Sequence, residues 1–162
     1  MDGTNQAIRW ISIIFAVLLV GLVIFLIVRQ FENYNAQNDP KLHELNQVFT
    51  EFFSQDKKWG GNLKMLNKRK PYQEVSLYKG DNSYTINKQR IFMCLKDEHG
   101  EYYPMNMLIY VLAHEYAHVL AKSIGHTDEF HAIFEDLLGE LVDAGIYDPK
   151  QELITDYCQH DN

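Results

Sequence analysis

Hydrophobic residues are distributed along this chain in two different ways, and the first is an uninterrupted run. Trp10 to Val28 is nineteen residues without a charged side chain, bounded by Arg9 and Arg29. A helix rises about 1.5 Å per residue, so this run covers about 28 Å, close to the hydrocarbon core of a bilayer. We expect residues 10–28 to form one transmembrane helix in contact with lipid.

A cleaved signal peptide is the competing interpretation of this run. Its apolar region would be only about 7–15 residues long, with a small-residue cleavage site after it. No A-x-A pattern follows Val28, so we favour an uncleaved anchor and a single-pass membrane protein. The orientation stays open, because Arg9 and Arg29 place one cation on each side of the span.

After the span, apolar residues recur at the spacing of secondary structure. About 130 residues follow the anchor, which suits one domain with one core. Helical spacing from Asp39-Pro40 to Ser54 predicts an amphipathic helix. Alternating runs predict short strands over 75–78, 84–86 and 90–96. The expected division is a flank (1–9), the span (10–28), a polar linker (29–39) and one domain (40–162).

Two further helices are predicted in the C-terminal half. Met105 to Ala121 contains no Gly or Pro, and residues 108–113 are apolar on every face, as in a buried helix. Gly125 lies just past its end, and a second helix with an apolar stripe is predicted from Asp128 to Ala144. A helix pair together with a small sheet predicts an α+β fold.

Three strongly polar residues interrupt the buried helix: His114, Glu115 and His118 form the pattern H-E-x-x-H. Residues four apart share one face of a helix, so both imidazoles can bind one ion. A catalytic Zn²⁺ uses three protein ligands plus a water, and Glu115 would stand beside that water as general base. The plainer interpretation is a hydrogen-bond network of two core histidines and a glutamate. We favour Zn²⁺, because burying such groups without a shared partner is costly.

A third ligand is expected downstream, where His126 and His131 compete. His126 follows Gly125 at the corner between the two helices, where a turn can aim a side chain at the preceding helix. His131 lies at the margin of the apolar stripe near Glu135, where it would be solvated or would contact a ligand rather than the ion. We favour His126. A glutamate ligand, Glu129 or Glu135, is a weaker option.

The residues around this pattern resemble the WLM/SprT-like group of zinc metallopeptidases. His114-Glu115-x-x-His118 followed by His126-x-x-Glu129-Phe130 is similar to that group, in which the third histidine opens the next helix. The similarity covers roughly residues 86–158 and includes small membrane-anchored members encoded by large DNA viruses. It implies a viral protein with a compact zincin-like domain that hydrolyses peptide bonds, with His126 as third ligand. The chain lacks the CxxC zinc ribbon of the DNA-repair members.

The same resemblance implies how a protein or peptide substrate is held. In zincin-like folds an edge strand pairs with the substrate backbone, and the strand around Arg90 to Leu95 is the expected one. A further donor should stabilise the oxyanion. Tyr110, one turn before His114, and His131 are candidates for that role.

Charged residues are distributed unevenly along the predicted domain. Residues 57–96 hold ten Lys and Arg against two acids, whereas residues 97–162 hold two against fourteen. The basic block can contact phospholipid headgroups, or the two halves can neutralise each other. The net charge of −7 argues against nucleic acid as main partner.

Cys94 and Cys158 permit one disulfide, but a buried free thiol is the default for Cys94. Cys158-x-His160 could bind metal, although a polar tail is simpler.

Two functions of other classes remain compatible with these features. One is an inactive zincin-like membrane protein with structural zinc that binds a partner, for example within a virion. The intact Glu115 argues against it, because a structural zinc site does not need a general base. The other is a zinc-free structural membrane protein with a helical core.

Overall fold

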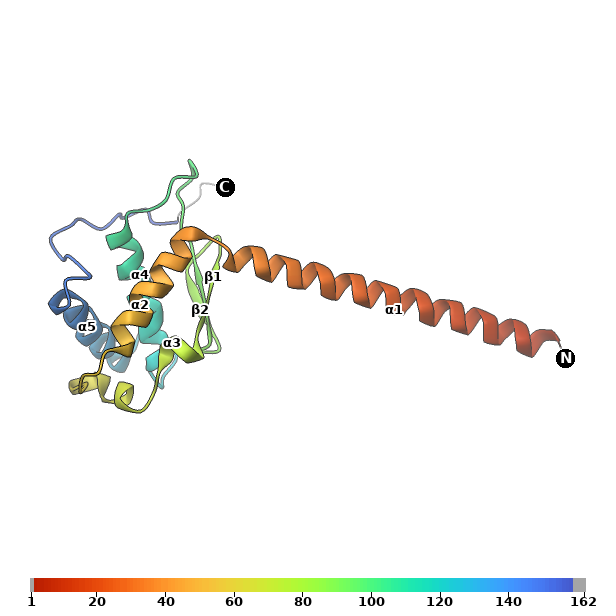
Figure 1. The fold of residues 1–162 in the computed structure, drawn as a ribbon, viewed down its shortest axis with the longest axis horizontal. Helices are drawn as coiled ribbons and strands as arrows, with labels where there is room; N and C mark the ends of the chain where they lie inside the picture. Colours follow the sequence, from red (N-terminus) through yellow and green to blue (C-terminus); the bar gives the residue numbers. More distant parts are fainter. Residues whose placement is uncertain (1, 159–162) are drawn as a thin grey trace. The chain divides into compact units, whose positions relative to one another are not determined.

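The computed structural model describes residues 2–158, which form two compact units that divide after residue 36. The first unit consists of helix α1, Asp2–Gln37, apart from its last residue (Figure 1). Its segment Ile8–Gln37 has a mean hydropathy of 3.4 in its most apolar window and is long and apolar enough to cross a membrane. The predicted helix over 10–28 is confirmed. It continues through most of the expected linker, because no Pro or Gly occurs between Gly21 and Pro40 to end it.

The second unit contains the three helices predicted for the domain, each with ends within about one residue of the expected ones. They are α2 (Pro40–Ser54), α4 (Met105–Leu120) and α5 (Asp128–Asp143). Asp39 caps α2, because its Oδ1 accepts hydrogen bonds from the backbone N–H groups of Lys41 (2.9 Å) and Leu42 (3.3 Å). Two short helices, η1 (Gly61–Asn67) and α3 (Pro71–Glu74), were not predicted.

A three-stranded sheet completes the mixed helix-and-sheet domain. Its strands are β1 (Ser76–Lys79), β2 (Tyr84–Ile86) and β3 (Arg90–Met93), in the order β1-β3-β2. β3 pairs with β1 in parallel and with β2 in antiparallel orientation. The expectation that the strand around Arg90 to Leu95 is an edge strand was therefore wrong. Both sides of β3 are occupied by neighbours, and β2 is the edge strand that packs against α4.

α4 lies at the centre of the core, packed against α5, β2 and α3. In Figure 1 the sheet and α5 lie on opposite sides of this helix. Tyr116 of α4 is fully buried and stacks on Phe49 of α2, with 5.2 Å between ring centroids. Because α4 is fixed by packing along almost its whole surface, the polar side chains it carries have defined positions.

A disulfide joins Cys94 and Cys158, whose Cα atoms are 6.3 Å apart. The expectation of a free thiol at Cys94 was wrong, because the C-terminal tail returns to the end of β3. Tyr157 supports this position: its hydroxyl donates to the carbonyl oxygen of Cys94 (2.5 Å) and hydrogen-bonds with Ser83 Oγ (2.8 Å). The suggested ligand His160 lies outside the described residues.

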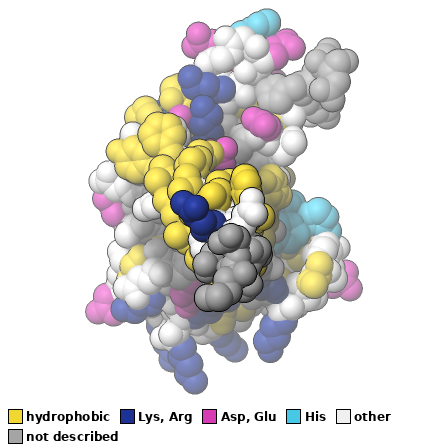
Figure 2. Space-filling model, turned by 90° about the vertical axis from the view of Figure 1, so that its right-hand side faces the viewer, with side chains coloured by type: hydrophobic (Ala, Val, Ile, Leu, Met, Phe, Trp, Pro, Cys, Tyr) yellow, Lys and Arg dark blue, Asp and Glu magenta, His cyan; other side chains and the backbone are white. Residues whose placement is uncertain are grey.

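Among residues 57–158, one ion pair joins the basic half of the domain to the acidic half, between Lys57 Nζ and Glu140 Oε2 at 2.7 Å. Other Lys and Arg side chains gather at the lower edge of the face drawn in Figure 2. One basic side chain is therefore paired with the acidic half, and a group of cations faces solvent.

Candidate metal centre

The three histidines chosen from the sequence come together. The ring nitrogens of His114, His118 and His126 that could bind an ion all lie within 4.8 Å of one another. Nε2 of His126 lies 3.0 Å from Nε2 of His114. Two nitrogens bound tetrahedrally to one zinc at about 2.0–2.1 Å would be about 3.4 Å apart. The three side chains are thus close enough to bind one metal ion.

Two of these histidines are placed by the buried helix and one by a loop. His114 and His118 lie one turn apart on α4 and are half-buried, whereas His126 is exposed on the loop before α5. Gly125 has φ 84°, a left-handed conformation that favours glycine, and it turns the chain directly before His126. The predicted corner geometry is therefore present.

Burial keeps the helical histidines in the form that binds metals. Burial, together with the neighbouring His118, His126 and His131, lowers the pKa of His114 to about 4. Burial also lowers the pKa of His118 below its usual value, as do His126 and Lys88. A metal-binding histidine must be neutral. At neutral pH both imidazoles therefore have an unprotonated nitrogen available.

Glu115 lies beside the histidines, with a side chain only 5% exposed. Its Oε2 accepts a hydrogen bond of 2.7 Å from the hydroxyl of Thr85 on β2. Burial raises the pKa of Glu115, and the hydrogen bond from Thr85 opposes this rise. A buried carboxylate held by one donor, with a raised pKa, suits a group that accepts and returns a proton.

One pocket of about 470 Å³ contains these groups. Its walls come from the end of α4, the loop before α5, and β2 with the turn that follows it. Its lining residues are Ser83, Tyr84, Thr85, Asn87, Lys88, His114, Glu115, His118, Ser123, Ile124, Gly125 and His126. The histidines and Glu115 therefore face a shared space that is open to solvent.

The other candidates lie outside this cluster. His131 is exposed on α5, with its ring centroid 6.3 Å from that of His126. The ring of Tyr110 packs on Phe134 (5.3 Å) and Tyr147 (6.0 Å), and Tyr110 does not line the pocket. His131 therefore lies next to a candidate ligand without belonging to the cluster, and Tyr110 packs among aromatic side chains away from the pocket.

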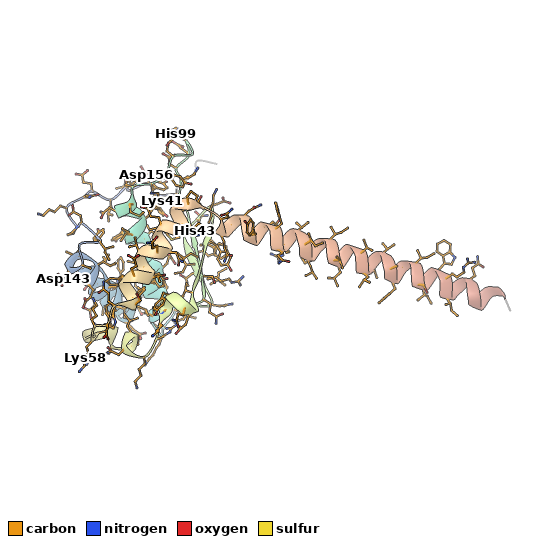
Figure 3. The ribbon with its side chains drawn as sticks, in the orientation of Figure 1. Lys41, His43, Lys58, His99, Asp143 and Asp156 are labelled. Carbon is orange, nitrogen blue, oxygen red and sulfur yellow. A yellow bond between two sulfur atoms is a disulfide. The ribbon has the colours of Figure 1, made fainter. Side chains whose placement is uncertain are left out.

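Glu129, Glu135 and two further described histidines have other surroundings. Glu129 accepts hydrogen bonds from the backbone N–H groups of Lys122 (3.2 Å) and Ser123 (3.0 Å), so it orders the loop. Glu135 is exposed and is not part of the histidine cluster. His43 and His99 lie at the surface, on α2 and on the loop that precedes α4 (Figure 3).

Two residues of the site were not anticipated from the sequence. Thr85 holds Glu115, and Lys88 donates from Nζ to the carbonyl oxygens of Ala121 and Lys122 at the end of α4. Both lie on β2 or its turn, about 30 residues before the motif. No local pattern connects them to the motif, because the contact depends on β2 packing beside α4.

Comparison with known proteins identifies viral relatives. The chain is 44% identical over 105 residues to uncharacterized protein 136R of Invertebrate iridescent virus 6, covering 63% of this chain and 59% of the relative. It is 38% identical over 99 residues to uncharacterized protein 042R of Invertebrate iridescent virus 3, covering 60% and 62%. It is 31% identical over 101 residues to uncharacterized protein R325 of Acanthamoeba polyphaga mimivirus, covering 53% and 51%.

These relatives are viral proteins. The expectation of a viral protein is supported by them. The chain spans about six tenths of the length of the two iridescent virus proteins and about half of the mimivirus protein. No protein-family model matches the chain, and no solved structure matches it.

Proposed function

We propose that this chain is a membrane-anchored zinc metallopeptidase. The observation that supports the proposal best is the pocket that joins three histidine side chains to a buried glutamate. Three imidazoles are a donor set that suits Zn²⁺, and three protein ligands leave a position for water or substrate. The resemblance of the motif residues to WLM/SprT-like metallopeptidases supports the same assignment.

His114, His118 and His126 would hold the ion, which when bound supplies Lewis acidity toward a water molecule and a peptide carbonyl. Glu115 takes one proton from the attacking water and later gives it to the leaving amine. Thr85 keeps the carboxylate aimed at the pocket while the proton moves.

β2 offers a place for the substrate backbone. It is an edge strand of the sheet, and Tyr84 and Thr85 of this strand line the pocket. An extended peptide can add to such an edge through main-chain hydrogen bonds. In this proposal β2 takes the role that the sequence had suggested for the strand around Arg90.

α1 would be the anchor. Within the described residues, no side chain in the most apolar part of α1 is buried against protein, as expected for a helix surrounded by lipid. An anchor would keep the enzyme at one membrane and restrict it to substrates that reach that surface.

The experiment uses the full chain in detergent micelles, with zinc measured by elemental analysis and hydrolysis measured on a peptide library. We expect about one zinc per chain and cleavage that Glu115→Gln lowers about 100-fold or more while the zinc remains. His126→Ala should lose zinc, and His131→Ala is the matched control that should keep it.

Three results would contradict the proposal in different ways. Absence of zinc in the wild-type protein would favour a zinc-free structural protein. Zinc without cleavage of any peptide would favour an inactive binding protein. Loss of zinc in His131→Ala but not in His126→Ala would show that the ligand set is wrong.

A further inference from the structure

The loop between α4 and α5 carries an unusually exposed apolar side chain. Ile124 is 92% exposed and lies two residues before His126, on the wall of the same pocket. A single exposed isoleucine is common on protein surfaces and needs no function. Ile124 differs because its backbone is held in place and because a second apolar side chain lies on the other wall.

Hydrogen bonds from two directions hold this loop. Lys88 donates from Nζ to the carbonyl oxygens of Lys122 (3.1 Å) and Ser123 (3.3 Å) as well as to that of Ala121. Glu129 accepts from the Ser123 hydroxyl at 2.7 Å and from the backbone N–H of the same residue. The chain just before Ile124 is therefore ordered before any ligand arrives, so little entropy is lost when a ligand contacts it.

Tyr84 supplies the second apolar side chain. It lies on β2, is 43% exposed and lines the pocket. Its ring stacks on Phe92 of β3 with 4.8 Å between centroids, which restricts its movement. Ile124 and Tyr84 come from the two segments that also supply His126 and Thr85.

Charged groups of the pocket are already engaged. Glu115 is the one carboxylate among the lining residues, and it accepts from Thr85. Lys88 is the one ammonium group among them, and it is bound by loop carbonyls. In this pocket neither charge is free to select a charged substrate side chain, whereas the apolar surface of Ile124 has no contact that covers it.

We propose that Ile124 and Tyr84 form an apolar subsite that selects a bulky aliphatic or aromatic substrate side chain close to the scissile bond. The inference rests on the proposed function, since it names the substrate class of the same site. Burying a larger apolar side chain removes more surface from water, and one methylene in such a pocket changes selectivity by roughly 10-fold or more.

The test uses the zinc-loaded full chain in detergent micelles and two peptide hydroxamates that differ in one side chain, Leu or Ala. We expect the Leu compound to bind at least about 10-fold more tightly. Ile124→Ala should lower that ratio to about 3-fold or less, and Tyr84→Ala should lower it in the same direction. Leu153→Ala is the matched control, because Leu153 is an exposed apolar residue that does not line the pocket.

Equal binding of the two hydroxamates, or a ratio unchanged in Ile124→Ala, would overturn the subsite. So would failure of the zinc-loaded protein to bind either compound. Selective binding without cleavage of any peptide would leave the subsite standing and remove the peptidase. Cleavage without side-chain preference would do the reverse. A protein without zinc would exclude both.

Discussion

Helices α1 and α4 are both apolar around most of their circumference, yet they have opposite surroundings. In α4 eleven side chains are buried, among them Leu112 and Ala113 at 0% exposure. In α1 the large apolar side chains from Ile8 to Phe31 are exposed. The two sequences differ in length of the apolar run and in the polar residues inside it. α4 is interrupted by His114, Glu115 and His118, whereas Trp10 to Val28 contains no charge.

The comparison shows that hydrophobicity alone does not decide where a helix resides. A helix that is apolar on all sides needs an apolar environment, which a domain core or a bilayer can provide. The run of seven apolar residues before His114 is too short to span a membrane, so the core is the available environment for α4. The polar residues at its end can be stable there because they share a pocket.

The same substitution in both helices should give the largest contrast. Leu112→Arg buries an unpaired charge in the core and should destabilise the domain by more than about 4 kcal/mol, enough to prevent folding. Leu19→Arg should leave the unfolding temperature of the domain unchanged and weaken retention in membranes during alkaline carbonate extraction. Circular dichroism and extraction measure the two effects. A folded Leu112→Arg domain would contradict the comparison.

Removal of zinc should have the next largest effect, and it should be confined to the domain. A metal that binds only the folded state stabilises it by about 4 kcal/mol when its free concentration is a thousand times Kd. We expect a chelator to lower the unfolding temperature of the domain and to leave the helicity of α1 unchanged. His126→Ala should remove the response, while His131→Ala retains it. A chelator response that persists in His126→Ala would place the metal elsewhere.

Loss of the disulfide should destabilise the domain by about 2–4 kcal/mol, because the bond restricts the unfolded chain. It links residues 64 positions apart and encloses α4 and α5. Thermal unfolding of the double variant Cys94→Ala, Cys158→Ala measures the change, with the reduced wild-type protein as comparison. Equal stability of the oxidised and reduced wild type would contradict a stabilising role for the disulfide.

The smallest predicted effect concerns the start of the domain. Asp39→Ala removes the cap of α2 and should lower stability by about 1 kcal/mol. Asp39→Asn keeps an oxygen acceptor and should cost less, which makes it the matched control. Urea unfolding monitored through Trp59, which is buried beside Phe52, measures both. An equal loss in the two variants would show that charge, rather than capping, is the main contribution.

The sequence predicted those parts of the fold that depend on local spacing. α2, α4 and α5 follow from apolar residues at helical spacing, and β2 follows from alternation between two turns. η1 and α3 were missed because the segment from Gly61 to Glu74 has no clear period. The assignment of the strand around Arg90 as an edge strand was wrong because a central and an edge strand of three or four residues look alike in sequence.

The candidate site residues also differ in whether local spacing or tertiary packing sets their positions. His114, Glu115 and His118 were found because one helical turn sets their spacing, and His126 because Gly125 marks the corner. Thr85 and Lys88 were missed because they reach the site through the packing of β2 against α4. The pairing of Cys94 with Cys158 depends on where the tail returns, which no local pattern specifies.

The disulfide also bears on which side of a membrane the domain occupies. Disulfides form and persist in oxidising surroundings, such as the lumen of the secretory pathway or the outside of a cell or virion, and are rare in the reducing cytosol. If the chain is anchored through α1, the bond between Cys94 and Cys158 favours the orientation in which the domain faces the oxidising side of the membrane. The arginines that flank the span do not favour either orientation.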